Sequence, residues 1–277
     1  MYLRPFLTLV VALAAVLPCA LLCPAARAAN PVPMAAHTAV YELTLDKAMS
    51  EDVAAVRGTM AYDVADACDG WATRQRLELT ISNRDGQDIH LVSDYTTWES
   101  KDGLSMRFRM KQATDTAVTD QAEGEARLER TGGPGTIHYT VPEERDMAMP
   151  AGTLFPMSHT EAILNGASEG KKFLSLPLFD GTGTKGAQDS SIVVLGWDAG
   201  GAAPYPALEG LAKGRVHIAF FDRGLPDAGA TKPAGSPDYE VSMTYWANGV
   251  ADGLHMHFTD FLMNGRLREF ALQAPHC

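Results

Sequence analysis

Strict alternation of apolar and polar residues is the feature that most constrains what this chain can fold into. It recurs over residues 39–46, 76–82, 104–111, 239–245 and 254–259. Successive side chains of a β-strand point to opposite faces, so this period of two predicts strands with one buried face. The run Ile192–Leu195 is apolar throughout and predicts a strand covered on both faces.

Short turn motifs separate these runs. They are Asn83-Arg84-Asp85-Gly86, Lys101-Asp102-Gly103, Asn248-Gly249 and Asn264-Gly265. Strands joined by tight turns pair in antiparallel fashion. The spacing predicts about 12–14 strands, and a twisted sheet of that size curls or closes. We therefore predict a mainly β fold, an antiparallel open β-barrel or β-spiral.

One segment interrupts the strand pattern. Ser158-His159-Thr160-Glu161 matches a capping box, and apolar residues follow it as far as Ala167. The sequence thus predicts one short helix that begins at Ser158 and packs on or in the sheet. Gly166–Gly170 also matches G-x-S-x-G, but a nucleophile elbow needs its helix after the serine rather than before it.

The N-terminus has the features of an export signal. Arg4 precedes an apolar run over Phe6–Cys23, and Ala26-Arg27-Ala28 places small residues where a signal peptidase reads them. We predict a signal peptide over residues 1–28, one domain over residues 29–277, and a periplasmic location. The alternative, that the apolar run stays as a membrane span, is disfavoured by the small residues that follow it.

Cysteine usage fits that compartment. Cys19 and Cys23 leave with the signal, so Cys68 and Cys277 remain. An even number in an oxidising compartment predicts one disulfide between them. It would close a loop of roughly 210 residues, worth at most ~5 kcal/mol in the chain-entropy model. The alternative is two free thiols.

Charge limits the partners. The formal net charge is −11, which argues against general binding of nucleic acid or anionic membranes. Basic residues nevertheless recur on the polar faces of two strands: Arg74, Arg76, Arg107, Arg109 and Lys111. If those strands are close, they form a basic stripe that docks an anionic envelope component or an acidic partner. The alternative is a solvated face with Glu78 and Glu99 as partners.

No catalytic or metal constellation is evident. His255 and His257 share a strand face, but the sequence indicates no third ligand, so we expect a solvated pair without metal or cofactor. The rival hypothesis is a hydrolase of cell-wall or lipid material. It would assemble Ser158, His159 and Asp180 from distant parts of the sequence.

An ordered set of short motifs resembles the envelope integrity protein B (EipB) family of periplasmic proteins. The motifs are His37–Leu45, Gly58–Tyr62, Ala67–Trp71, Leu154–His159, Pro177–Gly181, Phe220–Asp222, Tyr245–Val250 and the terminal Cys277. The set extends over nearly the whole chain after the signal.

The resemblance implies an open β-barrel or β-spiral with a helix, and a disulfide between the cysteines at 68 and 277. It also implies a role in keeping the cell envelope intact under stress, without enzyme activity. By analogy of fold with lipoprotein carriers, a lipid-like or peptide ligand is expected. We thus predict a non-enzymatic periplasmic protein that binds a partner protein or an amphiphilic ligand on its concave face. A third possibility is a purely structural scaffold with a filled interior.

Overall fold

The computed structural model describes residues 33–223 and 235–274, which lie in one compact unit over residues 31–277. The predicted signal peptide and Cys277 fall outside the described residues. Within the described ranges, no helix has the length and apolar character needed to span a membrane.

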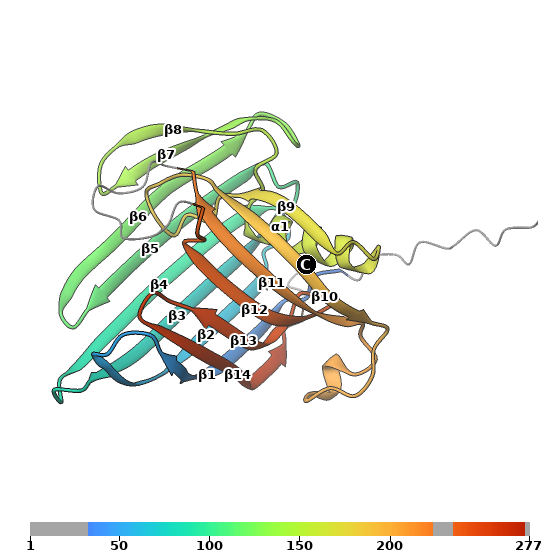
Figure 1. The fold of residues 1–277 in the computed structure, drawn as a ribbon. Helices are drawn as coiled ribbons and strands as arrows, with labels where there is room; N and C mark the ends of the chain where they lie inside the picture. Colours follow the sequence, from blue (N-terminus) through green and yellow to red (C-terminus); the bar gives the residue numbers. More distant parts are fainter. Residues whose placement is uncertain (1–32, 224–234, 275–277) are drawn as a thin grey trace, which may run out of the picture. The chain divides into compact units, whose positions relative to one another are not determined.

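The described residues contain fourteen strands in a single antiparallel sheet, as the alternation predicts (Figure 1). The strands are β1 (His37–Ala48), β2 (Val53–Asp66), β3 (Gly70–Asn83), β4 (Asp88–Ser100), β5 (Ser105–Thr114), β6 (Ala117–Leu128), β7 (Gly135–Val141), β8 (Arg145–Met149), β9 (Phe173–Leu178), β10 (Gln188–Asp198), β11 (Lys213–Asp222), β12 (Tyr239–Trp246), β13 (Ala251–His257) and β14 (Phe261–Leu272). A short 3₁₀ turn, η1 (Pro206–Leu208), precedes β11.

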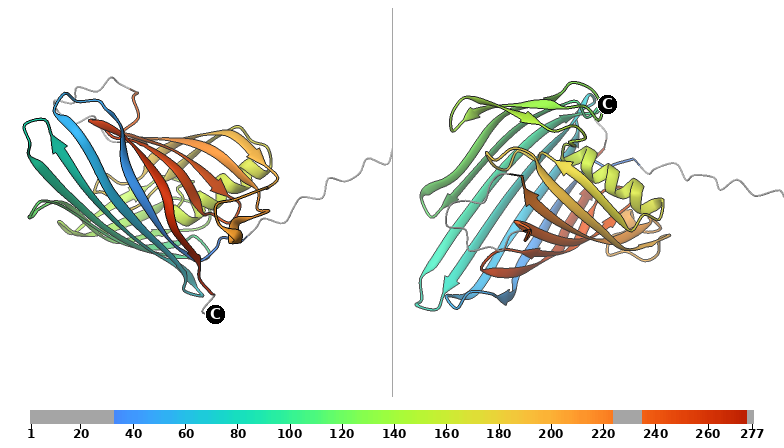
Figure 2. Two further views of the ribbon diagram at one scale, coloured as in Figure 1. Left: turned by 90° about the horizontal axis from the view of Figure 1, so that it is seen from below. Right: turned by 45° about the horizontal axis from the view of Figure 1, so that its top comes forward.

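The sheet is a meander that stays open. Its order runs from β8 back to β1, then from β14 back to β9, so the first and last strands pair in the middle. The two ends of the sheet are therefore β8 and β9. The halves β1–β8 and β9–β14 face one another across an interior, and the sheet curls rather than lying flat (Figures 1 and 2). This confirms the predicted open barrel or spiral.

Glycines on the concave face allow the curl. One cross-strand row runs through Leu254, Gly265, Leu43, Gly58 and Leu79. A Cβ at Gly58 would lie 2.7 Å from Leu79 Cδ2, and one at Gly265 would lie 3.0 Å from Leu43 Cδ2. The leucines thus occupy the space that the glycines leave, as at kinks in strongly curved sheets. The predicted turn at Asn264-Gly265 is wrong, because Gly265 lies inside β14 and serves this close approach.

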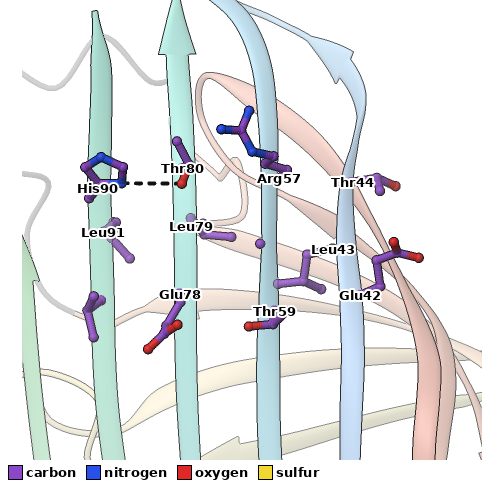
Figure 3. Close-up of a pocket in the computed structure, with 12 residues that line it drawn as sticks. Glu42, Leu43, Thr44, Arg57, Thr59, Glu78, Leu79, Thr80, His90 and Leu91 are labelled. Atoms are coloured by element: carbon purple, nitrogen blue, oxygen red, sulfur yellow. Dashed lines mark hydrogen bonds between the residues drawn. The ribbon is translucent and has the colours of Figure 1, made fainter.

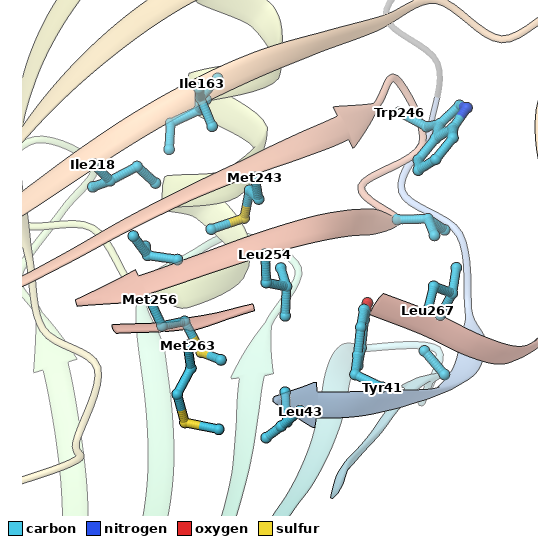
Figure 4. Close-up of a cluster of buried hydrophobic side chains, with 14 of the residues drawn as sticks. Tyr41, Leu43, Ile163, Ile218, Met243, Trp246, Leu254, Met256, Met263 and Leu267 are labelled. Atoms are coloured by element: carbon cyan, nitrogen blue, oxygen red, sulfur yellow. The ribbon is translucent and has the colours of Figure 1, made fainter. Parts of the chain in front are cut away.

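The helix α1 (Pro156–Ser168) connects the two ends of the sheet and packs against β9 and β10. Its residues Ile163 and Ala167 are buried in the main core, together with residues from both halves of the sheet (Figure 4). A parallel bridge between Leu154 and Leu178 fixes the segment before the helix to β9. The predicted short helix is thus present, and it lies on the concave side.

The predicted start of the helix is wrong. The N-cap is Phe155, with Pro156 in the first turn, and no side chain of the helix caps it. Proline is favoured at the first helical position because its fixed φ matches the helical backbone. The N–H group that proline lacks would have no partner within the helix there. Glu99 of β4 instead accepts the N–H groups of Met157, at 2.7 Å, and Ser158, at 2.9 Å.

Strand β10 also departs from expectation. Ile192 and Val194 are buried, whereas Leu195 is 60% exposed. The strand is therefore covered on its interior face only. The continuous apolar run reflects a sheet with one solvent-facing side and not a doubly covered strand.

The segment 179–187 between β9 and β10 lines the interior. Phe179 packs edge-on against Phe108 and Tyr139, with ring centroids 5.2 Å and 6.4 Å away. The hydroxyl of Tyr95 donates to the backbone carbonyl of Asp180, and that of Tyr139 donates to the carbonyl of Gly183. Because these contacts tie the segment to β4 and β7, they hold Asp180 at the inner face of the sheet.

Candidate functional site

A cavity of about 540 Å³ lies in the interior of the curled sheet. Residues from β1–β3, β10–β13, α1 and the segment after β9 line it. The apolar part of its wall is rich in aromatic residues and methionine: Met60, Tyr62, Leu77, Met157, Phe220, Tyr239, Val241, Met243, Tyr245, Leu254, Met256 and Phe258. A volume of this order and a mostly apolar wall are typical of small-molecule sites.

Polar groups gather at one part of the wall. The backbone N–H and the hydroxyl of Thr182 donate to Asp180 Oδ1, at 3.0 and 2.8 Å, and Gln188 Nε2 donates to Oδ2 at 2.9 Å. Burial raises the pKa of the Asp180 carboxyl, and these hydrogen bonds oppose the rise. His37 and Gln75 add further polar atoms to the lining. An apolar wall with a few grouped polar residues suits an amphiphilic molecule.

The tyrosines of the lining are largely withdrawn from bulk water. Tyr62, Tyr239 and Tyr245 each keep some accessible surface, yet burial raises the pKa of all three hydroxyls. Both observations agree if the accessible surface borders the cavity. A polar part of a ligand would therefore gain more from a hydrogen bond there than in water.

Glu99 positions the wall that α1 contributes. Its side chain is 1% exposed, and its Oε1 also accepts from the Ser158 hydroxyl at 2.5 Å. Burial raises the pKa of this carboxyl, while the hydroxyl and the two helix N–H groups pull it down. A carboxylate at a helix N-terminus is stabilised by the unpaired N–H groups and the helix dipole. The cap thereby fixes Met157 and Thr160 at the cavity wall.

Comparison with known proteins places this arrangement in a family. The model of the family described as EipB-like matches residues 28–274. The chain belongs to the EipB-like family. It is also 30% identical over 252 residues to the cell envelope integrity protein EipB of Brucella abortus (strain 2308), covering 88% of this chain and 86% of that protein. The resemblance inferred from the sequence motifs is confirmed.

A solved structure shows the same fold in this family. The chain is similar to the crystal structure of a beta-barrel-like protein of the domain of unknown function DUF1849 from Brucella abortus. The TM-score is 0.76 at 25% identity, with 88% of this chain and 100% of that chain covered. Membership of the EipB-like family supports an envelope-related role for this chain. The EipB-like family is not a known family of enzymes.

The residues of the rival hydrolase hypothesis make separate hydrogen bonds in this EipB-like chain. Ser158 donates to Glu99, and Asp180 accepts from Thr182 and Gln188. His159 Nε2 lies 2.8 Å from Ser190 Oγ, whose hydroxyl donates to the carbonyl of Leu176 at 2.7 Å. Burial lowers the pKa of His159 to about 4. Neither serine is therefore presented to a base in a Ser–His–Asp arrangement.

The structure brings the basic stripe together on the outer face of the sheet. Cross-strand rows place Arg74 opposite Thr96 and Arg109, and Arg76 opposite Asp94 and Lys111. Acidic groups interleave with the stripe. Arg76 forms ion pairs with Glu78 and Asp94, each at 2.7 Å, and Arg109 lies 3.5 Å from Glu123. Arg107 stacks over Trp98, 4.8 Å from the ring centroid. Docking by this stripe stays a prediction.

The outer face also holds a shallow groove over β1–β4 (Figure 3). Its charged and polar residues are Glu42, Thr44, Arg57, Thr59, Glu78, Thr80 and His90. Its two glutamates form ion pairs with arginines: Glu42 with Arg268, and Glu78 with Arg76. This surface is chemically unlike the interior cavity, which combines an apolar wall with one polar group of residues.

Cys68 lies between β2 and β3 and is in a disulfide. Its backbone φ is 69°, and its N–H donates to Asp66 Oδ1 at 3.0 Å. Cys277 is outside the described residues, so the pairing of Cys68 with Cys277 stays a prediction.

The cavity residues are those that sequence reasoning did not single out. In the sequence, Tyr239, Val241, Met243 and Tyr245 read as the buried face of a strand, and Asp180 reads as a possible catalytic acid; neither pattern predicts that these residues share a cavity. Bulky aromatic residues and methionines alternating on several strands are a signal of a large interior. They do not distinguish a filled interior from a hollow one.

Proposed function

We propose that this chain is a non-enzymatic periplasmic protein that supports the cell envelope by holding an amphiphilic ligand in its interior cavity. The apolar part of the ligand contacts the methionine and aromatic wall, and its polar part contacts Asp180, Thr182 and Gln188. The cavity of about 540 Å³ carries the proposal, because it joins a large apolar wall to a few grouped polar residues. Membership of the EipB-like family and the envelope role named for the Brucella relative support it.

Ala251 offers a direct test. It lines the cavity, whereas Ala61 of β2 is exposed and belongs to the opposite face. Ala251→Phe fills part of the cavity, and Ala61→Phe adds the same side chain outside it. We expect Ala251→Phe to weaken binding of an environment-sensitive apolar dye, N-phenyl-1-naphthylamine, by about tenfold or more, and Ala61→Phe to leave binding unchanged.

Native mass spectrometry of the protein purified from its own periplasm identifies the ligand. We expect an adduct with the wild type that is lost with Ala251→Phe. A wild-type protein that carries no adduct and binds the dye no more tightly than Ala251→Phe would contradict the proposal. In that case, crosslinks formed in the periplasm between the basic stripe and another envelope protein would favour a scaffold that binds this protein at its outer face.

A further inference from the structure

A cluster of histidines and carboxylates lies on the outer face of the sheet, away from the cavity. His255 and His257 alternate with the buried Leu254 and Met256 of β13, so their rings lie on the outward side. Glu240 of β12 is the cross-strand partner of His257. Asp46 reaches the cluster from β1, where a register shift between Leu45 and Lys47 interrupts the pairing with β14. Such bulges redirect a side chain and are common beside functional sites.

The two rings share a consistent geometry. His257 Nε2 lies 3.0 Å from His255 Nδ1. The outer nitrogens both face carboxylates: His255 Nε2 lies 3.0 Å from Asp46 Oδ2, and His257 Nδ1 lies 3.4 Å from Glu240 Oε2. Asn264 Nδ2 donates to the second Asp46 oxygen at 3.1 Å. Each ring therefore points one nitrogen at the other ring and one at a carboxylate.

We propose that His255 Nδ1 and His257 Nε2 together bind one transition-metal ion, for which Cu²⁺ is the best match. Metal-binding histidines usually donate their second ring N–H to a carboxylate, which fixes the tautomer and the ring orientation. His255 has that hydrogen-bonded partner in Asp46, and His257 Nδ1 lies 3.4 Å from the Glu240 carboxylate. The ion takes the place of the single proton that links the two inner nitrogens, and this proton goes to solvent.

The distance between the inner nitrogens favours copper. Two nitrogens each ~2.0 Å from a shared ion and 3.0 Å from one another subtend roughly a right angle at that ion. A right angle fits the square-planar or tetragonal sites of Cu²⁺ better than the wider tetrahedral angle of Zn²⁺. Imidazole nitrogen is also a preferred ligand of copper, which binds most tightly among the divalent first-row ions.

The rest of the coordination sphere is left to solvent or to an exchangeable ligand. The described part of the chain has no group of three or more histidine, cysteine or carboxylate ligands arranged to hold a metal ion. The side chains of His255 and His257 are 27% and 35% exposed, so an ion can reach them from outside. The site is thus an open, two-histidine site for an exchangeable ion and not a structural metal centre.

Copper titration of the full chain tests the site. Isothermal titration calorimetry with Cu²⁺ in glycine buffer, which competes for weakly held copper, should show one equivalent bound. Electron paramagnetic resonance should show coupling to two imidazole nitrogens. We expect His255→Ala or His257→Ala to abolish this binding. Asp46→Asn keeps both ligands and should weaken it by about 10–100-fold.

His138 of β7 provides the matched control. It is an exposed histidine that lies 2.7 Å from the carboxylate of Asp146, and its other ring nitrogen faces Glu144 and not a second histidine. His138→Ala should bind Cu²⁺ as the wild type does. The proposal is overturned if the wild type binds no copper under these conditions, or if His255→Ala and His257→Ala bind it as tightly as the wild type. Unchanged affinity in Asp46→Asn would overturn the orienting role of that carboxylate.

Discussion

Glu99 illustrates, at the scale of single residues, how far a side chain can lie from where its pattern would put it. From its charge, Glu99 is expected on the solvated outer face, as a partner of the basic stripe. The structure reverses this: Tyr95, Thr97 and Glu99 face the interior, and Trp98 lies under Arg107 on the outside. The expectation that Glu99 pairs with the basic stripe is therefore wrong. The N–H groups of α1, which belong to a distant part of the sequence, make the buried carboxyl tolerable.

The raised pKa of Glu99 predicts a specific dependence of stability on pH. A carboxyl whose folded pKa exceeds its unfolded value stabilises the fold below the unfolded pKa, and this stabilisation is lost as pH rises through the folded pKa. Glu99→Gln cannot titrate, and it leaves one helix N–H without its acceptor, at a cost of about 1–3 kcal/mol. The stability gap between wild type and variant should therefore be largest at acid pH and shrink as pH rises.

Urea unfolding of both proteins over a pH series measures this gap. Other titrating groups, such as Asp180, are present in both proteins, so their contributions to the pH dependence cancel in the difference in stability. A gap that stays constant with pH, or grows as pH rises, would show that the folded pKa of Glu99 is not raised.

At the scale of single elements, a second prediction concerns the glycines of the curled strands. A Cβ at Gly58 would lie 2.0 Å from the backbone oxygen of Glu78, which cannot move aside without disturbing β3. Gly58→Ala should therefore destabilise the fold by about 1–3 kcal/mol or more. Gly196 of β10 has no atom within 4 Å of the added Cβ, so Gly196→Ala is the matched control and should be neutral or stabilising by up to about 1 kcal/mol.

Thermal and urea unfolding compare the two glycine variants. Equal stability of Gly58→Ala and Gly196→Ala would show that the concave row does not need its glycines.

The same row shows what the sequence alone could not predict. A glycine after an asparagine is a strong turn signal, and only the pairing of β14 with β1 reveals that Gly265 lies in mid-strand opposite Leu43.

At the scale of the whole molecule, the sequence predicts the architecture better than the interior. Local alternation and turns are enough for an antiparallel meander, and its size requires a curl. The cavity depends on how side chains from strands far apart, such as Met60 of β2 and Met243 of β12, meet across the sheet. The copper-site geometry depends likewise on the bulge that brings Asp46 to His255. No local pattern encodes such long-range placement.

The last prediction concerns the disulfide, because it would link two parts of the chain that are far apart in sequence: Cys68 follows β2, and Cys277 follows β14. If Cys68 pairs with Cys277, each single change to serine removes the same crosslink and should cost about 2–5 kcal/mol in oxidising buffer. Cys68→Ser, Cys277→Ser and the double variant should then unfold at the same temperature, since the effects of partners in one bond do not add. Reducing the wild type should lower its melting temperature to that common value. A Cys277→Ser variant that melts like the oxidised wild type would show that the sulfur of Cys68 is bonded elsewhere.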